Sequence, residues 1–282
     1  MLTQAQQSDD RAHAIVGSKT QSMSDNVKAY LPRIDSIKRG IRRLREGNNL
    51  PAPGRDDMDF DIPNDYAILI DGRQFLQYDN GNGEARILIY GTAAGLSFLT
   101  NSPDWFMDGT FKVAPPQFAQ LYTVHGLKEG HHVIGCYALL PNKQTETYVE
   151  FLQQVEQLTS AASPESIMID FEQACINAVS QVFPQSTLVG CLFHLCKSIH
   201  RHVKSSGFQQ EYLENEEFRT HIRMISALAF VPLEDIITAF NALSDICHGN
   251  ETTILDYFEI NYIGELRRGR RRRRNPLFAH QL

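Results

Sequence analysis

The chain has 282 residues, of which 42% are hydrophobic and 21% charged, a composition typical of a globular protein with one large domain or two modest ones. No apolar run approaches the roughly 18 residues of a membrane-spanning helix, and the first residues lack the apolar stretch of a secretory signal. The odd set of five cysteines lies within apolar patterns, which indicates reduced thiols in an intracellular protein: Cys136, Cys175, Cys191, Cys196 and Cys247.

The net charge of −6 hides a strong asymmetry. One short segment holds seven arginines, and subtracting their seven positive charges from −6 leaves −13 for the rest of the chain: Arg267, Arg268, Arg270, Arg271, Arg272, Arg273 and Arg274. Such a run is typical of a nuclear-localisation signal or a DNA-phosphate contact, and equally of a solvated linker. Any affinity for nucleic acid must come from local patches of this kind, because the remainder is acidic.

The N-terminal third divides into two predicted parts. Residues 1–24 are rich in Gln, Ser and Asp without periodicity and are expected to be disordered. Residues 25–98 are expected to form a region of helix and short strands. Within it, Ile34, Ile37 and Ile41 make one apolar stripe on a helix whose other faces are basic. That helix lies either on DNA phosphates or with its basic face in solvent.

Residues 99–207 show the clearest alternation of strand and helix. The patterns predict three consecutive strands, then helix, strand, helix, strand and helix, which indicates an α/β domain with a mixed sheet. The predicted strands are 105–113, 120–128, 132–140, 166–171 and 187–193, and the predicted helices are 145–160, 172–183 and 194–207. Residues 208–265 are predicted to be all-helical, and 266–282 form the arginine-rich tail.

Two aspartates lie within the apolar strands of this predicted sheet. Asp108 follows Trp105 and Phe106 in the first strand, and Asp170 ends the fourth. Aspartate is rare inside strands, and a buried carboxylate is costly unless it is paired or binds a metal. The pattern favours a two-carboxylate site for divalent metal ions of the kind used in phosphodiester chemistry. The alternative is structural: Asp108 starts an Asp-Gly turn and Asp170 caps the next helix.

The stretches DGTFKVAPPQFAQLYTVHG, YALLPNKQTETYVEFL, IMIDFEQACINAVSQVFP and GCLFH closely resemble the Mutator-like element (MULE) transposase domain, over roughly residues 104–231. The resemblance implies a ribonuclease-H-like mixed sheet with flanking helices, followed by an all-helical insertion. It also implies an Asp-Asp-Glu triad that binds Mg²⁺ or Mn²⁺. In this sequence Asp108 matches the first acid and Asp170 the second.

The Cys191-Leu-Phe-His194 segment matches a further signature of these transposases. Together with Cys196 and His200 it offers four zinc-ligand types, but their spacing does not favour zinc, because His194 and His200 lie about 240° apart around a helix. We expect His194 to point into the catalytic cleft and Cys191 to pack as a small apolar residue.

A third acid is not evident from the sequence. In the resembling family it follows the helical insertion, where this chain has only the NPLFAHQL segment. Of the glutamates available, Glu259 is the candidate for the third acid that we would test. Glu172 is interpreted as a first-turn residue favoured by the helix dipole. No cysteine precedes Cys136, so the N-terminal zinc finger of the family is not expected either. Both observations predict a truncated or decayed copy.

The sequence thus predicts the core of a transposase that cleaves and transfers DNA strands, acting in the nucleus if the element is eukaryotic. Its expected partners are the terminal repeats and target DNA, with homo-oligomers formed on that DNA. The alternative is a catalytically silent module that keeps the fold to bind DNA or protein. A non-transposing nuclease or a zinc-binding adaptor is a third hypothesis.

Overall fold

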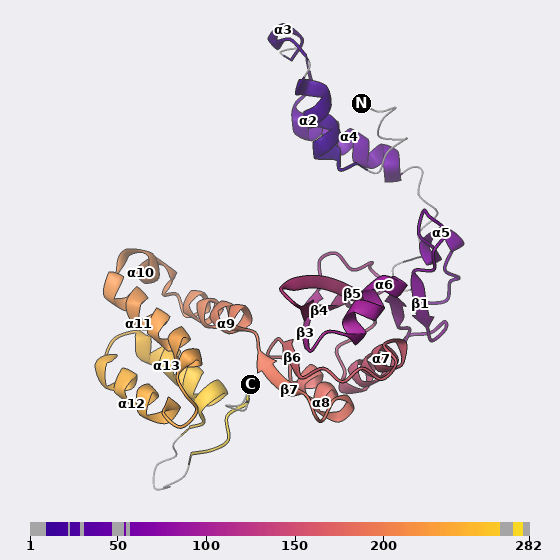
Figure 1. The fold of residues 1–282 in the computed structure, drawn as a ribbon. Coiled ribbons are helices and arrows are strands. Elements are labelled where there is room, and N and C mark those ends of the chain that lie inside the picture. The colour runs from indigo at the N-terminus through magenta and orange to yellow at the C-terminus, as the bar shows by residue number, and fades with distance from the viewer. Residues whose placement is uncertain are drawn as a thin grey trace. The chain divides into compact units, whose positions relative to one another are not determined.

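The computed structural model describes residues 10–21, 23–28, 31–46, 54, 57–265 and 273–278. The chain divides into two compact units, Met1–Gly54 and Arg55–Leu282, which are taken one at a time below (Figure 1). Within the described ranges, no helix combines the length and the apolar character needed to cross a membrane.

The first unit is a small group of helices, α2 (Ala12–Gln21), α3 (Asp25–Lys28) and α4 (Ile34–Glu46). Ile15 and Val16 of α2 are buried together with Ile41 of α4. The expectation of disorder for residues 1–24 therefore differs from the structure over α2, because two adjacent apolar residues are enough to pack this short helix against the predicted stripe of α4. The structure does not describe the side chains of three of the basic residues on α4, which are Arg42, Arg43 and Arg45.

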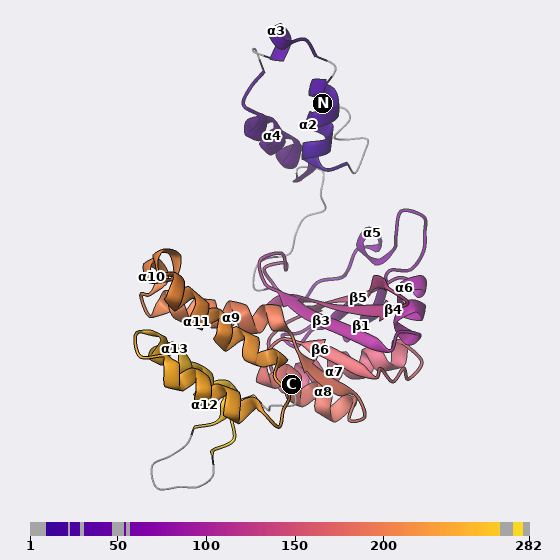
Figure 2. The ribbon, with the colours of Figure 1, turned by 60° about the vertical axis from the view of Figure 1, so that its left-hand side comes forward.

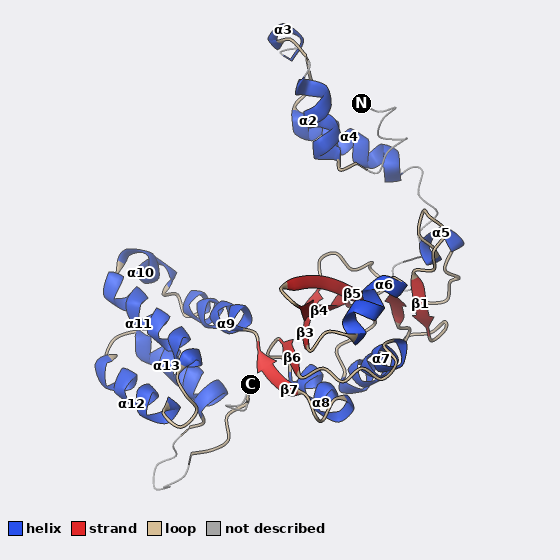
Figure 3. Ribbon diagram, viewed as in Figure 1, coloured by secondary structure: helices blue, strands red, loops and turns tan. Residues whose placement is uncertain are grey.

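The second unit is built on one seven-stranded mixed sheet in the order β1-β2-β5-β4-β3-β6-β7 (Figure 3). Its strands are β1 (Leu76–Asp79), β2 (Leu88–Tyr90), β3 (Asp104–Thr110), β4 (Gln120–Lys128), β5 (His131–Leu140), β6 (Ser166–Ile169) and β7 (Thr187–Gly190). The short helix α5 (Asn64–Ala67) precedes β1, and the helices between the strands are α6 (Ala93–Thr100), α7 (Thr145–Leu158) and α8 (Gln173–Val182).

The strands β3, β4 and β5 pair antiparallel in chain order, whereas β6 pairs parallel with β3 and β7 parallel with β6. Parallel pairing requires a crossover, and α7 and α8 supply the two crossovers from β5 to β6 and from β6 to β7. The five predicted core strands are all present, and this mixed order with flanking helices is consistent with a ribonuclease-H-like fold.

One face of the sheet forms the main core. Trp105, Val124 and Ile167 are fully buried there against α6, α7 and α8. The Trp105 indole Nε1 donates to the Leu99 carbonyl of α6 at 3.1 Å, so the one tryptophan of the chain ties β3 to that helix. Alternate residues of β3 face the other way, which is what period-two burial of a strand predicts.

The outer strands β1 and β2 extend the sheet beside β5. They are fastened by Arg86, whose buried guanidinium lies 2.7 Å from the Asp79 carboxylate and 4.6 Å from the centroid of the Phe60 ring. Burial works against ionisation of Asp79, but the Arg86 guanidinium and the Gly81 amide hold the pKa of this carboxyl below its usual value.

The C-terminal part is all-helical, as predicted. It consists of α9 (Leu192–Ser205), α10 (Gln209–Glu214), α11 (Glu216–Ala227), η1 (Leu228–Phe230), α12 (Ile236–Ile246), α13 (Glu251–Phe258) and the π-helical turn η2 (Glu259–Ile263). Its helices form a second core, with α9, α11, α12 and α13 lying together (Figure 2), and α9 follows β7 in the chain (Figure 1). Phe171 and Tyr262 pack against both cores and join the sheet to the helices.

Candidate functional site

Asp108 lies on β3, and Asp170 follows directly after Ile169, the last residue of the neighbouring parallel strand β6. Phe106 of β3 is the register partner of Met168 of β6, so two residues further on Asp108 comes alongside Asp170. Neighbouring strands lie about 4.8 Å apart, which brings two such side chains within reach of a shared ligand. The two acids thus meet at the end of β6 although 61 intervening residues separate them in the chain.

The Asp170 carboxylate is the more enclosed of the two. Burial raises its pKa, and the negative charges of Glu172 and Asp108 raise it further, against the opposing effects of His194 and Lys143. Asp108 is about half exposed, with 53% of its side chain accessible. The pair combines one desolvated and one accessible carboxylate, and a bound cation would offset the repulsion between them.

His194 lies beside Asp108. Its Nε2 lies 3.7 Å from the Asp108 carboxylate Oδ1, and its Nδ1 is buried with no hydrogen-bond partner among the described residues. Residues 191–193 were predicted as strand, but β7 ends at Gly190 and Cys191 is the N-cap of α9. The reason is that the Cys191 amide donates the last sheet hydrogen bond to Ile169, while its carbonyl accepts the first one of the helix from Leu195.

Glu172 belongs to this group, which sequence reasoning missed. Its carboxylate accepts a hydrogen bond from Lys143 Nζ at 2.6 Å and one from the Tyr148 hydroxyl at 2.8 Å. Tyr148 in turn accepts from Gln120 Nε2 at 2.7 Å. Glu172 precedes α8 as its N-cap without capping it through its side chain. The Glu172 carboxylate is thus held by α7 and by the loop that precedes it, and Gln120 of β4 supports this contact through Tyr148, a connection that only the fold creates.

A pair of histidines lies on the strands beside Asp108. The rings of His125 on β4 and His132 on β5 stack with centroids 4.7 Å apart, and His125 Nε2 lies 3.0 Å from the Thr123 hydroxyl. That hydroxyl donates to the Asp108 carbonyl at 3.3 Å. Burial and the neighbouring His132 lower the pKa of His125, with Asp108 opposing them. The sheet around Asp108 therefore presents two stacked imidazoles and a hydroxyl.

Glu259, the predicted third acid, lies in the helical part at the start of η2, where its carboxylate accepts a hydrogen bond from Arg273. Arg273 also donates to the Gly264 carbonyl at 2.7 Å and to Asn241 at 3.0 Å. Of the other predicted DNA-contacting arginines, Arg274 is described, and the rest lie outside the described residues: Arg267, Arg268, Arg270, Arg271 and Arg272.

The donor set at Asp108 and Asp170 fits a hard divalent cation, because carboxylate oxygens are the ligands that Mg²⁺ and Mn²⁺ prefer. The raised pKa of Asp170 reflects first its burial and then the nearby charges of Glu172 and Asp108, and a bound cation would oppose all three effects. Among the residues that the structure describes, no three His, Cys, Asp or Glu side chains are already arranged as a ligand set. A bound cation would therefore take water and phosphate oxygens for its remaining positions.

Known families provide an independent comparison for this arrangement. Residues 105–198 match the family model of the MULE transposase domain. The MULE transposase domain thus covers the sheet from β3 to β7 and the first half of α9, including Asp108, Asp170 and His194, while Glu259 lies outside it. The match indicates a transposase-related function, which implies DNA as a partner. No curated protein matches the chain.

Proposed function

We propose that this protein carries out metal-dependent cleavage and transfer of DNA strands in transposition, with Asp108 and Asp170 as the metal-binding carboxylates. The observation that carries the proposal is that Asp108 on β3 and Asp170, just after the end of the parallel strand β6, are close enough for the charge of Asp108 to act on Asp170, within the matched MULE transposase domain. The desolvated, like-charged surroundings of Asp170 support the same reading, because a cation there would relieve the repulsion.

Mg²⁺ or Mn²⁺ bound at this pair would supply a Lewis acid that activates the attacking oxygen and stabilises the leaving oxygen of a phosphodiester. The chain's own residues would hold and orient it. Asp108 is accessible to a DNA phosphate, and His194 beside it is placed to donate a hydrogen bond to that carboxylate or to a phosphate oxygen. Lys143 and Tyr148 fix Glu172 beside Asp170, where it adds a third negative charge.

The test is a nicking assay on supercoiled plasmid DNA and on labelled duplexes that carry candidate terminal repeats, with Mg²⁺ or Mn²⁺ and with EDTA. We expect metal-dependent nicking by the wild type and a loss of at least about 100-fold in Asp108→Asn and Asp170→Asn, because neutral amides bind the cation poorly. Glu172→Gln and Glu259→Gln, made in parallel, identify which glutamate contributes.

Asp104→Asn is the matched control. Asp104 lies four residues before Asp108 on the same strand, and its carboxylate accepts from the Ser166 hydroxyl at 2.6 Å, a bond that asparagine can keep. Metal titration followed by thermal unfolding gives a readout that does not depend on turnover: Mn²⁺ should raise the Tm of the wild type and of Asp104→Asn but not of Asp108→Asn. If the wild type binds DNA without nicking it, and neither Mg²⁺ nor Mn²⁺ changes its Tm, the protein is instead a catalytically silent DNA-binding module.

A further inference from the structure

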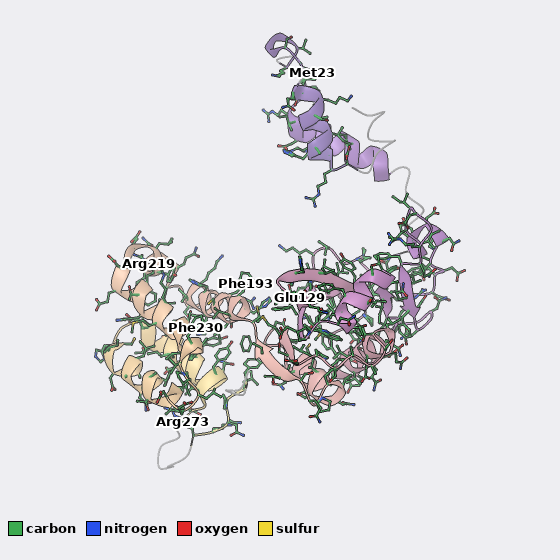
Figure 4. All side chains as sticks on the ribbon, in the orientation of Figure 1. Met23, Glu129, Phe193, Arg219, Phe230 and Arg273 are labelled. Carbon is green, nitrogen blue, oxygen red and sulfur yellow. The ribbon has the colours of Figure 1, made fainter. Side chains whose placement is uncertain are left out.

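The exposed face of α9 begins next to the acidic pair and is unusually rich in positive charge. Phe193 is 66% exposed, and Lys197, Arg201 and Lys204 are exposed as well. The Lys197 ammonium lies 5.6 Å from the centroid of the Phe193 ring. Phe193 lies on α9 (Figure 4). These four side chains are called the α9 stripe below.

Helical geometry makes the α9 stripe one continuous surface. At about 100° and 1.5 Å per residue, the four positions fall within an arc of roughly 80° and extend about 16 Å along the axis. The opposite face carries Leu195, Ile199 and Val203, which are buried in the helical core. Packing therefore fixes the rotation of α9, and it holds the stripe out toward solvent.

The charge of the stripe is uncompensated. No aspartate or glutamate occurs between Glu172 and Glu211, although the chain contains 33 of them, and the same segment carries Lys197, Arg201, Lys204, His194, His200 and His202. The described residues supply no ion pair to the three stripe cations. In a body that is strongly acidic outside its arginine run, an acid-free basic surface of this kind is complementary to phosphates.

The position of the stripe connects it to the candidate site. His194, the neighbour of Phe193 in the chain, lies 3.7 Å from Asp108, and the two adjacent rings pack edge-to-face at 5.4 Å. A strand whose phosphate lay at Asp108 would therefore meet Phe193 first and the three cations at successive turns. Aromatic side chains exposed beside such cations are the usual platform on which unpaired bases stack.

We propose that the α9 stripe binds the DNA strand that flanks the scissile phosphate, with Lys197, Arg201 and Lys204 on backbone phosphates and Phe193 stacked on an unpaired base at the cleavage point. The inference rests on the proposed function for the location of that phosphate. It adds the surface that holds the strand and a preference for DNA that is frayed or single-stranded beside the cut.

The first test measures binding without chemistry. Fluorescence anisotropy in EDTA uses a labelled 20-base-pair duplex with a ten-nucleotide single-stranded extension. We expect Lys197→Gln/Arg201→Gln to weaken binding about tenfold or more at low salt and to lower the slope of log affinity against log salt by about 1.5–2, because two phosphate contacts are lost. Arg73→Gln/Arg223→Gln removes the same number of exposed charges elsewhere and should leave the slope unchanged.

The second test isolates the aromatic ring. Phe193→Ala should weaken binding to the extended DNA by about fivefold or more while affecting a blunt duplex less, because a stacked base is lost. Phe193→Tyr should restore it. The matched control is Phe230→Ala, whose ring is 74% exposed in the helical part. Both phenylalanines are exposed, so the Tm of each variant should stay close to that of the wild type.

The outcomes separate the surface from the chemistry. Equal losses in the α9 and control double variants, or no DNA binding by the wild type in EDTA, would overturn the proposed surface. Selective loss in the α9 variants supports it even if the wild type cuts no DNA, in which case the proposed strand cleavage fails alone. If Asp108→Asn abolishes nicking while the α9 variants bind DNA normally, the chemistry stands and the surface is wrong.

Discussion

Gly109, which follows Asp108 on β3, has no room for a larger side chain. A Cβ added there would lie 2.7 Å from Gln120 Oε1 and 3.1 Å from Tyr122 Cδ2. Gln120 is fully buried, and its amide nitrogen holds the Tyr148 hydroxyl that in turn donates to Glu172. The glycine of the Asp-Gly pair is therefore explained by close packing under the site, and not by a turn.

The substitution Gly109→Ala should lower the free energy of unfolding by about 1–3 kcal/mol, the usual cost of overpacking a core. Urea unfolding measures the change. Gly40→Ala serves as the control, because a Cβ at Gly40 meets nothing within 4 Å and α4 should tolerate or even prefer alanine. A stability of Gly109→Ala equal to that of the wild type would mean that Gln120 moves aside at no cost.

At the scale of single residues, the sequence predicts best those residues whose place follows from the apolar alternation of their own strand. The alternation around Trp105 and Ile167 allowed Asp108 and Asp170 to be placed on strands of one sheet, and the parallel register then brings them level. The network at Glu172 was not predictable, because Lys143, Tyr148 and Gln120 come from three separate elements and no local pattern connects them.

Among the elements, strand and helix order followed from periodicity, while boundaries did not. The predicted strand 105–113 ends at Thr110, and 187–193 ends at Gly190, because pairing stops where the neighbouring strand has no further partner. The pattern of apolar residues in the sequence does not show at which residue the strand pairing ends. The helix α2 was missed for a related reason: its packing depends on Ile41, which lies far along the chain.

A largely buried hydrogen bond between a histidine and a glutamate joins two helices of the C-terminal part. His221 Nδ1 of α11 lies 3.0 Å from the Glu251 carboxylate at the start of α13, and both side chains are nearly inaccessible. Burial works against the charge of Glu251, but the hydrogen bond to His221 and backbone amides outweigh it and lower the pKa of Glu251 below the ordinary 4.5. A lowered folded-state pKa stabilises the fold at higher pH, and this stabilisation is lost as the pH falls through that pKa.

The substitution Glu251→Gln should therefore cost about 1 kcal/mol at pH 7, where a charged hydrogen bond becomes a neutral one. The difference from the wild type should begin to shrink once the pH falls below 4.5, because the unfolded-state carboxyl then takes up a proton, and it should disappear as the pH falls through the lower folded-state pKa. Urea unfolding at pH 7 and pH 4 gives both values. Glu84→Gln, at an exposed position, should match the wild type at each pH. A constant deficit across this range would contradict the ionic account.

On the scale of the whole second unit, the sheet and the helical part meet at an aromatic junction. Phe171 packs edge-to-face against Tyr262 at 5.3 Å and against Phe278 at 5.2 Å, and Tyr262 stacks on Phe278 at 5.5 Å. Phe171 stands between Asp170 and Glu172 in the chain. The contact that docks the helices therefore also fixes the segment that carries two of the three clustered carboxylates.

The substitution Phe171→Ala should release the helical part before the sheet, at a cost of roughly 2–4 kcal/mol for a partly buried ring. Hydrogen exchange should accelerate in α11, α12 and α13 and stay unchanged in β3, β4 and β5, because the sheet keeps its own core of Trp105 and its neighbours. Phe230→Ala, which removes an exposed ring, should leave both regions unchanged. Since the loop at Asp170 loses its support, the Mn²⁺-dependent rise in Tm should also diminish in Phe171→Ala. Uniform acceleration in sheet and helices would show instead that the two cores unfold as one, with the junction acting only as part of a continuous interior.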